Sequence, residues 1–180
     1  PNFISEDDIE KAILQRFEQL GFELLNCYTA DADDLNDGSR RADKRDVIFR
    51  ERLKAGAVRL NPYLPETAID KALSTLTDQR YAKSRADANR EVDNLIRDGI
   101  PVEYENSQGK TTQGRVRVIN FNEFDNSTNA LGCNEYLAVS QLWIKGEQRY
   151  RRPDIILYIN GLPLVFIELK NSNVKLQAAF

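Results

Sequence analysis

The clearest hydrophobic pattern in the sequence is a pair of apolar segments that flank residues 160–163. Both segments are rich in Ile, Leu, Val and Phe, and the intervening Asn160-Gly161 pair accepts the left-handed backbone of a tight turn. We therefore predict a β-hairpin. Three charged residues, Asp154, Glu168 and Lys170, interrupt this apolar pattern. Because burial of an unpaired charge costs several kcal/mol, their presence in the hairpin requires an explanation.

The hairpin register decides whether the three charges meet. Side chains alternate along a strand, so Glu168 and Lys170 share one face. A regular hairpin with a two-residue loop at Asn160-Gly161 would place Asp154 opposite Ile167, on the wrong side from Glu168. A three-residue loop or a bulge brings Asp154 opposite Glu168 or within one diagonal step of it. We therefore predict an odd loop or a bulge.

Two carboxylates and one ammonium group on a single patch suit a hard divalent cation. Mg²⁺ is the usual choice, with Mn²⁺ as the alternative, and water and a substrate phosphate complete its ligands. Such a metal would polarise a phosphoryl group and acidify a water for in-line attack, while the lysine would stabilise or orient that nucleophile. The alternative is an exposed hairpin whose charges are only solvated, which the flanking apolar residues disfavour.

The same residues resemble the motif of the PD-(D/E)xK nuclease superfamily, with Pro153-Asp154 followed by Glu168-Leu169-Lys170. Residues 151–171 are similar in particular to the N-terminal nuclease domain of the restriction (R) subunit of type I restriction-modification enzymes, and residues 52–65 resemble its Leu-Asn-Pro region. The resemblance implies an α/β fold with a restriction-endonuclease-like core, a central mixed β-sheet flanked by α-helices. It also implies that Asp154 and Glu168 bind the metal, that the Leu169 backbone carbonyl adds a ligand and that Lys170 positions the attacking water.

A helix is predicted near the N-terminus. Ser5 and Asp8 can form a capping box, apolar residues recur at helical spacing up to Leu20, and Gly21 ends the helix. The passage resembles the opening helix of the same nuclease family, in which an acidic residue often completes the metal site. Glu10 is the candidate and Glu6 the reserve, although acidic residues are also common at helix N-termini because of the helix dipole.

The acidic and basic residues that follow have two interpretations. Residues 26–40 are polar and acidic, and we expect a solvated loop because the spacing of an EF-hand is missing. The next residues lead into a helix and alternate basic with acidic side chains, which indicates a solvated helix face rather than a contact with DNA phosphates. The basic residues are Arg40, Arg41, Lys44, Arg45, Arg50 and Arg52.

The middle of the chain is predicted to continue with a helix after Pro65, a helix over residues 87–97 and a strand from Ile100. Gly109-Lys110-Thr111 fits a hairpin turn and not a phosphate-binding loop. Residues 115–121 and 135–144 read as two strands of a central hairpin that adds the third and fourth strands of a four- or five-stranded sheet. We expect one nuclease domain over residues 1–180, with a helical part over about 1–99 and the catalytic sheet over about 100–170.

The amino-acid composition excludes several classes of catalytic and metal site. The chain has 41% hydrophobic and 29% charged residues, which is typical of a soluble globular protein. The absence of histidine excludes Ser-His and Cys-His triads and most zinc sites. Only Cys27 and Cys133 occur, so we expect free thiols and a cytoplasmic protein with no membrane span. The net charge of −3 indicates weak binding of DNA by the domain alone.

The resemblance has consequences beyond this chain. The family's Gln-x-x-x-Tyr element would follow the hairpin, but Gln177 is not followed by a tyrosine, so we expect the chain to be part of a longer protein. That protein would contain a helicase-like translocase that binds ATP, which this chain does not, and would assemble with methylation and specificity subunits.

The expected function is Mg²⁺-dependent endonucleolytic hydrolysis of double-stranded DNA, with unmodified foreign DNA cleaved after translocation. Two alternatives stay open: another PD-(D/E)xK nuclease that acts in repair or junction resolution, and a non-catalytic docking module of the same fold.

Overall fold

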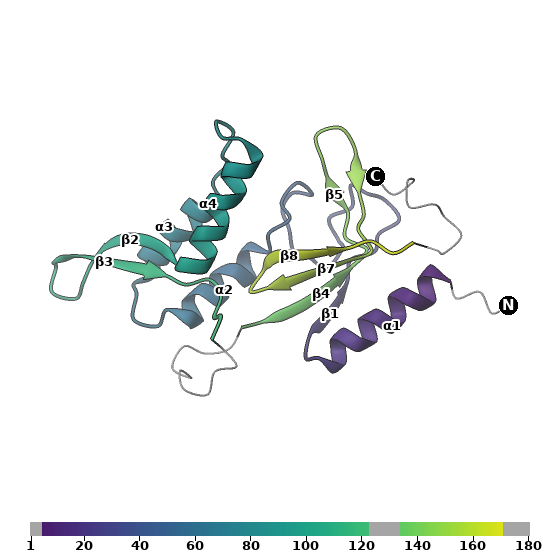
Figure 1. Cartoon of the computed structure of the whole chain (residues 1–180), viewed down its shortest axis with the longest axis horizontal. Helices are drawn as coiled ribbons and strands as arrows, with labels where there is room; N and C mark the ends of the chain where they lie inside the picture. The colour runs from purple at the N-terminus through teal and green to yellow at the C-terminus, as the bar shows by residue number, and fades with distance from the viewer. Residues whose placement is uncertain (1–4, 123–133, 171–180) are drawn as a thin grey trace. The chain divides into compact units, whose positions relative to one another are not determined.

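The computed structural model describes residues 5–122 and 134–170, and the chain divides into two compact units (Figure 1). The first unit combines Pro1–Phe49 with Glu135–Phe180, and the second is Arg50–Asn134. The second unit is therefore inserted in the sequence of the first. The expected division near residue 99 falls inside the second unit, and the expectation of a single domain stays a prediction.

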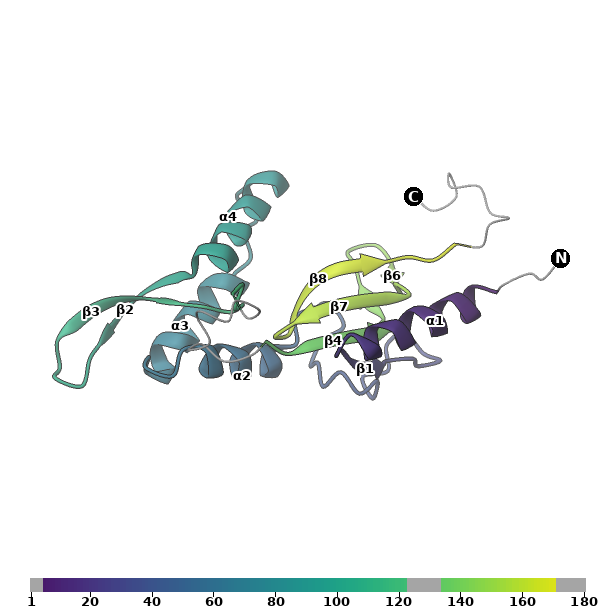
Figure 2. The same ribbon diagram turned by 60° about the horizontal axis from the view of Figure 1, so that its bottom comes forward.

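The first unit contains a four-stranded mixed sheet with the order β1-β4-β7-β8 (Figure 2). β1 runs parallel to β4, whereas β4 pairs with β7 and β7 with β8 in antiparallel fashion. A small separate ribbon pairs β5 with β6. The central mixed sheet of an α/β fold is thereby confirmed. The strands are β1 (Glu23–Asn26), β4 (Tyr136–Ser140), β5 (Ile144–Lys145), β6 (Tyr150–Arg151), β7 (Ile155–Ile159) and β8 (Leu162–Ile167).

Helix α1 (Glu6–Gln19) precedes the sheet and contacts β1. The predicted capping box is present, because the Ser5 hydroxyl accepts the Asp8 N–H and the Asp8 carboxylate accepts the Ser5 N–H. Gly21, at φ +91°, allows the chain to turn back after the helix. The ring of Phe22 lies 5.2 Å from Phe17 and 5.3 Å from Tyr136, so an aromatic chain joins the helix to β4.

The core of the first unit lies between the sheet and the segment that connects β1 to the second unit. Phe49 stacks on Tyr158 with ring centroids 4.4 Å apart, and the Tyr158 hydroxyl donates to the Val47 carbonyl at 2.9 Å. Burial raises the pKa of Cys27 to about 12, so this thiol is protonated and unreactive. The other cysteine, Cys133, lies outside the described residues. The core residues are Cys27, Phe49, Leu137, Val139, Leu142, Ile156 and Tyr158.

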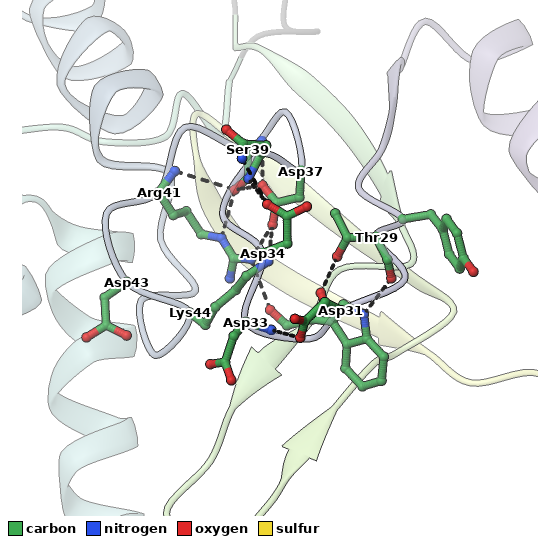
Figure 3. A network of polar contacts seen from close by, with 12 residues as sticks. Thr29, Asp31, Asp33, Asp34, Asp37, Ser39, Arg41, Asp43 and Lys44 are labelled. Atoms are coloured by element: carbon green, nitrogen blue, oxygen red, sulfur yellow. Dashed lines mark hydrogen bonds and ion pairs between the residues drawn. The ribbon is translucent and has the colours of Figure 1, made fainter.

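A buried ion cluster, formed by Asp37, Ser39, Arg41 and Lys44, organises the segment between β1 and Phe49 (Figure 3). The expectation that this acidic and basic region is wholly solvated was wrong. Arg41 Nη2 and Lys44 Nζ lie 3.0 and 2.7 Å from Asp37 Oδ2, and their side chains are almost fully buried. Arg41 also donates to the Trp143 carbonyl at 2.9 Å, so the cluster ties the loop to the chain after β4.

The second unit contains three helices and one hairpin among its described residues. The helix predicted after Pro65 and the turn at Gly109 are confirmed, and Asn106 N–H donates to the Lys110 carbonyl across that turn at 3.0 Å. The predicted third helix is confirmed as well, and Ser84 caps it. The elements are α2 (Arg50–Leu60), α3 (Glu66–Thr77), α4 (Arg85–Asp98), β2 (Ile100–Glu105) and β3 (Thr111–Val116).

The predicted pairing of residues 115–121 with residues 135–144 was wrong. β3 pairs with β2 as a separate two-stranded sheet, and the neighbours of β4 are β1 and β7. The short turn at Gly109 favours the local hairpin because it closes a much smaller loop than residues 122–134 would. Asn61 then binds the backbone of Arg117 through both its amide nitrogen and its oxygen, immediately after β3.

Among the described residues, none of the helices combines the length and the apolar character that crossing a membrane requires.

Candidate active site

The β7–β8 hairpin has a regular two-residue turn followed by a bulge. Asn160 and Gly161 have φ values of +48° and +79°, as a tight hairpin turn requires. The register changes between Leu157 and Tyr158: Tyr158 pairs with Pro163 and Leu157 with Val165, which leaves Leu164 as the extra residue. The prediction of an odd loop or a bulge is confirmed.

The bulge sets the position of the charged residues. Ile155 pairs with Ile167 at the end of the ladder, and by the same register Asp154 comes opposite Glu168. If the same sequence formed a regular ladder with no bulge, this turn would have placed Asp154 opposite Ile167. The register shift of one residue is therefore what brings Asp154 and Glu168 to one face.

Two hydrogen bonds join the predicted site residues. Asp154 Oδ2 accepts the Leu169 N–H at 2.6 Å, and Lys170 Nζ donates to Glu168 Oε1 at 2.8 Å. Asp154 is half-buried, whereas Glu168 and Lys170 are exposed. We call Asp154, Glu168 and Lys170 the hairpin triad. The register and these contacts bring the three residues to the same end of the hairpin, and their roles stay a prediction.

Glu10 of α1 reaches this region through Gln141. The Gln141 amide Nε2 donates to Glu10 Oε2 at 2.7 Å, and the Gln141 backbone N–H donates to the Asp154 carbonyl at 3.1 Å. One residue thus contacts both the helix carboxylate and the strand that carries Asp154. Gln141 has a left-handed backbone with φ +59°, which is uncommon for a residue other than glycine. The strain fits a site whose geometry the surrounding structure fixes.

The charged groups of this region influence one another's pKa values. Burial raises the pKa of Glu10, the hydrogen bond from Gln141 opposes this effect, and the negative charge of Asp154 raises the pKa further. The hydrogen bond with Glu168 raises the pKa of Lys170, and the charges of Glu168, Asp154 and Glu6 act in the same direction. Lys170 is therefore firmly protonated at neutral pH.

The donor chemistry of this site fits a hard divalent cation. Asp154, Glu168 and the Leu169 carbonyl supply only oxygen ligands, which Mg²⁺ and Mn²⁺ prefer. In residues 5–122 and 134–170, no three carboxylate, thiol or imidazole side chains are gathered closely enough to hold a metal ion. A site with two carboxylates is compatible with this finding, whereas Glu10 is engaged by Gln141, and its role as a ligand stays a prediction.

Sequence reasoning missed Gln141 and the aromatic environment of Arg152. Gln141 interrupts the apolar run between Val139 and Leu142, and this polar interruption was the available signal. Arg152 lies over the rings of Trp143 and Tyr28, a contact between distant parts of the sequence that no local pattern indicates. The expected helix around Val174 and the Gln177 position lie outside the described residues.

Comparison with known proteins points in one direction. Residues 3–180 match the family described as type I restriction enzyme R protein N terminus. The chain is 36% identical over 169 residues to the type I restriction enzyme HindI endonuclease subunit of Haemophilus influenzae, covering 93% of this chain and 15% of that protein.

A second relative, from Methanocaldococcus jannaschii, is provisionally named as the type I restriction enzyme MjaIXP endonuclease subunit. It is 28% identical over 178 residues, covering 96% of this chain and 16% of the relative. The chain therefore spans about one sixth of the length of these relatives. No solved structure matches it.

Proposed function

The chain belongs to the family of type I restriction enzyme R protein N termini, and from this premise we propose that its hairpin triad is a nuclease site that hydrolyses DNA phosphodiester bonds. The observation that carries the proposal is the bulge at Leu164, which places Asp154 opposite Glu168, next to Lys170. β-bulges are over-represented beside active sites, where they re-aim side chains, and at sheet edges. The names of the two relatives, both endonuclease subunits, support the same reaction class.

The metal is part of the proposal. Asp154, Glu168 and the Leu169 carbonyl would hold Mg²⁺, or Mn²⁺ as the alternative, and Glu10 is the candidate for a further ligand. When bound, such an ion supplies Lewis-acid polarisation of the phosphoryl group and a more acidic water. The pairing of Asp154 with the Leu169 N–H, at 2.6 Å, orients the carboxylate toward the strand that carries the other ligands.

We propose that Lys170 acts in its protonated form, as a donor of hydrogen bonds. Because the pKa of Lys170 is raised by its hydrogen bond with Glu168 and by the nearby carboxylates, the ammonium group donates hydrogen bonds and does not accept a proton at neutral pH. Its part in the reaction is to orient the attacking water and to stabilise negative charge on the phosphate oxygens through Nζ.

A second part of the proposal concerns the activity of the longer protein to which this chain belongs. We propose that the longer chain cleaves unmodified double-stranded DNA after ATP-driven translocation, together with methylation and specificity subunits. We assign target choice to the specificity subunits, and the described residues of this chain contain no base-reading motif. The net charge of −3 fits a domain to which other parts of the assembly deliver the DNA.

Calorimetric titration with Mg²⁺ and Mn²⁺ tests the metal site. We expect the chain to bind the metal and the Asp154→Ala and Glu168→Ala variants to lose binding. Asp43→Ala, which removes an exposed carboxylate paired with Arg45, is the matched control and should bind as the unmodified chain does. Equal binding by all four proteins, or no binding by the unmodified chain, would contradict the site.

Cleavage tests the catalytic role. In the assembled enzyme, Lys170→Ala should abolish DNA cutting and leave the circular dichroism spectrum unchanged, because Lys170 is exposed and its ion pair is at the surface. Asp154→Ala should also abolish cutting while assembly remains intact. Intact cleavage by Asp154→Ala would instead favour the docking module.

A further inference from the structure

We propose that Arg152, which lies over the rings of Tyr28 and Trp143, binds a phosphate of the DNA backbone beside the hairpin triad. The inference rests on the proposed nuclease function and names a substrate contact that the triad alone does not supply. Four independent features support it: the aromatic contacts of Arg152, the way the fold fixes the rings, the local charge, and the position of Arg152 relative to Glu10 and Asp154.

Arg152 is part of an alternating series of cations and aromatic rings. Its guanidinium carbon lies 4.8 Å from the ring centroid of Trp143 and 5.5 Å from that of Tyr28. Trp143 meets Tyr150 edge-on with centroids 6.2 Å apart, and Lys145 Nζ lies 5.2 Å from the Tyr150 centroid. We call these five residues the cation–aromatic array. Cation–π contacts of this kind restrict the guanidinium group and leave its charge in place.

The fold holds the rings of the array in position. The Trp143 indole N–H donates to the Thr29 carbonyl at 3.1 Å, which fixes the ring against the loop after β1. The β5–β6 pairing sets Lys145 opposite Tyr150. Since the rings are fixed, less conformational entropy is lost when Arg152 binds a ligand.

The segment that carries most of the array is basic although the chain is acidic, and Asp33 from the loop after β1 contacts only its Lys145–Tyr150 end. Residues 142–152 contain the acidic residue Glu147 and the basic residues Lys145, Arg149, Arg151 and Arg152, a local net charge of +3 (4 − 1) in a chain of net charge −3. Arg151 and Arg152 are exposed. A solvent-facing positive segment with interleaved aromatic rings fits a polyanionic partner.

The position of Arg152 links the array to the triad. It precedes Asp154 by two residues. Burial raises the pKa of Glu10, and the positive charge of Arg152 is one of the effects that oppose the rise, so the two side chains interact electrostatically. The planar guanidinium group can contact rings with its faces and donate in-plane N–H groups to two phosphate oxygens. A phosphate next to the one being cleaved is the ligand at this location.

The test measures binding of a short DNA duplex by this chain in EDTA, so that no cleavage takes place. Binding is followed by anisotropy of a labelled duplex and by emission of Trp143, which is the only tryptophan in the sequence. Arg152→Gln should weaken binding by on the order of tenfold at ~0.1 M salt and should lower the slope of log affinity against log salt by about 1. Arg152→Lys should keep the salt slope, because the charge remains.

Arg16→Gln is the matched control. It removes an exposed arginine from α1, outside the array, and should leave affinity and slope unchanged. A binding constant and slope for Arg152→Gln equal to those of Arg16→Gln would overturn the inference, as would the absence of salt-dependent binding by the unmodified chain. A change in Trp143 emission with inorganic phosphate alone, at the same phosphate concentration as the duplex, would assign the site to a free anion and overturn it too.

The metal titration of Asp154→Ala and Glu168→Ala separates this inference from the proposed function. If metal binding depends on both carboxylates but DNA binding ignores Arg152, the nuclease site stands and the phosphate contact fails. If DNA binding depends on Arg152 but metal binding does not depend on the two carboxylates, the phosphate contact stands and the metal site fails.

Discussion

The Asp37 ion cluster and the hairpin triad use the same chemistry in opposite ways. In the cluster, Asp37 Oδ1 accepts from the N–H and hydroxyl of Ser39, while Oδ2 accepts from Arg41 and Lys44, and the three ionic side chains are 0%, 1% and 3% exposed. In the triad, Glu168 and Lys170 are 53% and 35% exposed and share one ion pair. A saturated, buried carboxylate holds the fold, whereas an open carboxylate is available to a ligand.

The comparison explains why acidity alone does not identify a site. Burial would raise the pKa of Asp37, but hydrogen bonds from Lys44, Ser39 and Arg41 outweigh it and lower the pKa to about 2. At Glu10 the balance is reversed, because burial and the charge of Asp154 outweigh the hydrogen bond from Gln141. The pKa of the carboxyl group near Asp154 is therefore raised, whereas the pKa of Asp37 is lowered.

The largest expected effect is the loss of the cluster. Asp37→Asn leaves Arg41 and Lys44 buried without a counter-charge, so we expect the free energy of unfolding to fall by about 3–5 kcal/mol. Urea denaturation followed by circular dichroism measures it. Asp43→Asn, at the exposed pair with Arg45, is the control and should cause no measurable change. Equal stability of the two variants would show that the cluster does not hold the fold.

The second-largest expected effect is a loss of stability in acid, when Asp37 of the ion cluster becomes protonated. Because the folded pKa of Asp37 is about 2, below its usual 3.8, its ionisation stabilises the folded state above pH ~4, and this stabilisation is lost as the pH falls toward 2. The expected loss is about 2 kcal/mol. Unfolding free energies of the unmodified chain and of Asp37→Asn, measured between pH 5 and pH 2, should therefore converge as the pH falls. A constant difference would contradict the assignment.

A smaller effect on stability is expected for substitution of Gln141, which contacts both Glu10 and the backbone of Asp154 near the hairpin triad. Gln141→Gly removes the hydrogen bond to Glu10 and relieves the left-handed backbone at φ +59°, so the two changes in stability oppose each other and sum to within about 1 kcal/mol. The pKa of Glu10 should rise, because the amide hydrogen bond lowers it. Carboxyl NMR titration measures this rise. An unchanged pKa of Glu10 in Gln141→Gly would contradict the influence of this hydrogen bond.

The smallest effect is a change in one pKa. Asp154→Asn should lower the pKa of Glu10, since the negative charge of Asp154 disfavours ionisation of Glu10. The same NMR titration detects it, with Asp43→Asn as the control that should leave the pKa of Glu10 unchanged. A pKa that does not move in Asp154→Asn would separate Glu10 from the triad.

The sequence predicted those features that local patterns determine. The capping box of α1 follows from Ser5 and Asp8, and the need for a bulge follows from the spacing of Asp154 and Glu168 around an Asn-Gly turn. The location of the bulge at Leu164 did not follow, because a one-residue shift at any point between the turn and the charged residues restores the same pairing.

The missed features depend on contacts between distant segments. Arg41 and Lys44 looked solvated because acidic residues alternate with them, yet their partner is Asp37, buried with them in the same loop. Gln141 binds Glu10, 131 positions away in the sequence. The pairing of β3 was predicted wrongly because residues 115–121 alternate like a strand throughout, whereas Asn61 binds the backbone at Arg117 and the ladder ends at Val116.

The extra residue in β8 also bears on aggregation. β8 is the last strand in the sheet order, and its Leu164, Val165 and Phe166 side chains are 43–55% exposed. An edge strand of this composition is a template for pairing with another chain. Pro163 offers no N–H to such a partner, and the bulge bends the strand beside it. Deletion of Leu164 would keep Asp154 opposite Glu168 in a regular ladder but would straighten the edge, so we expect the shortened hairpin to self-associate more readily than the unmodified chain.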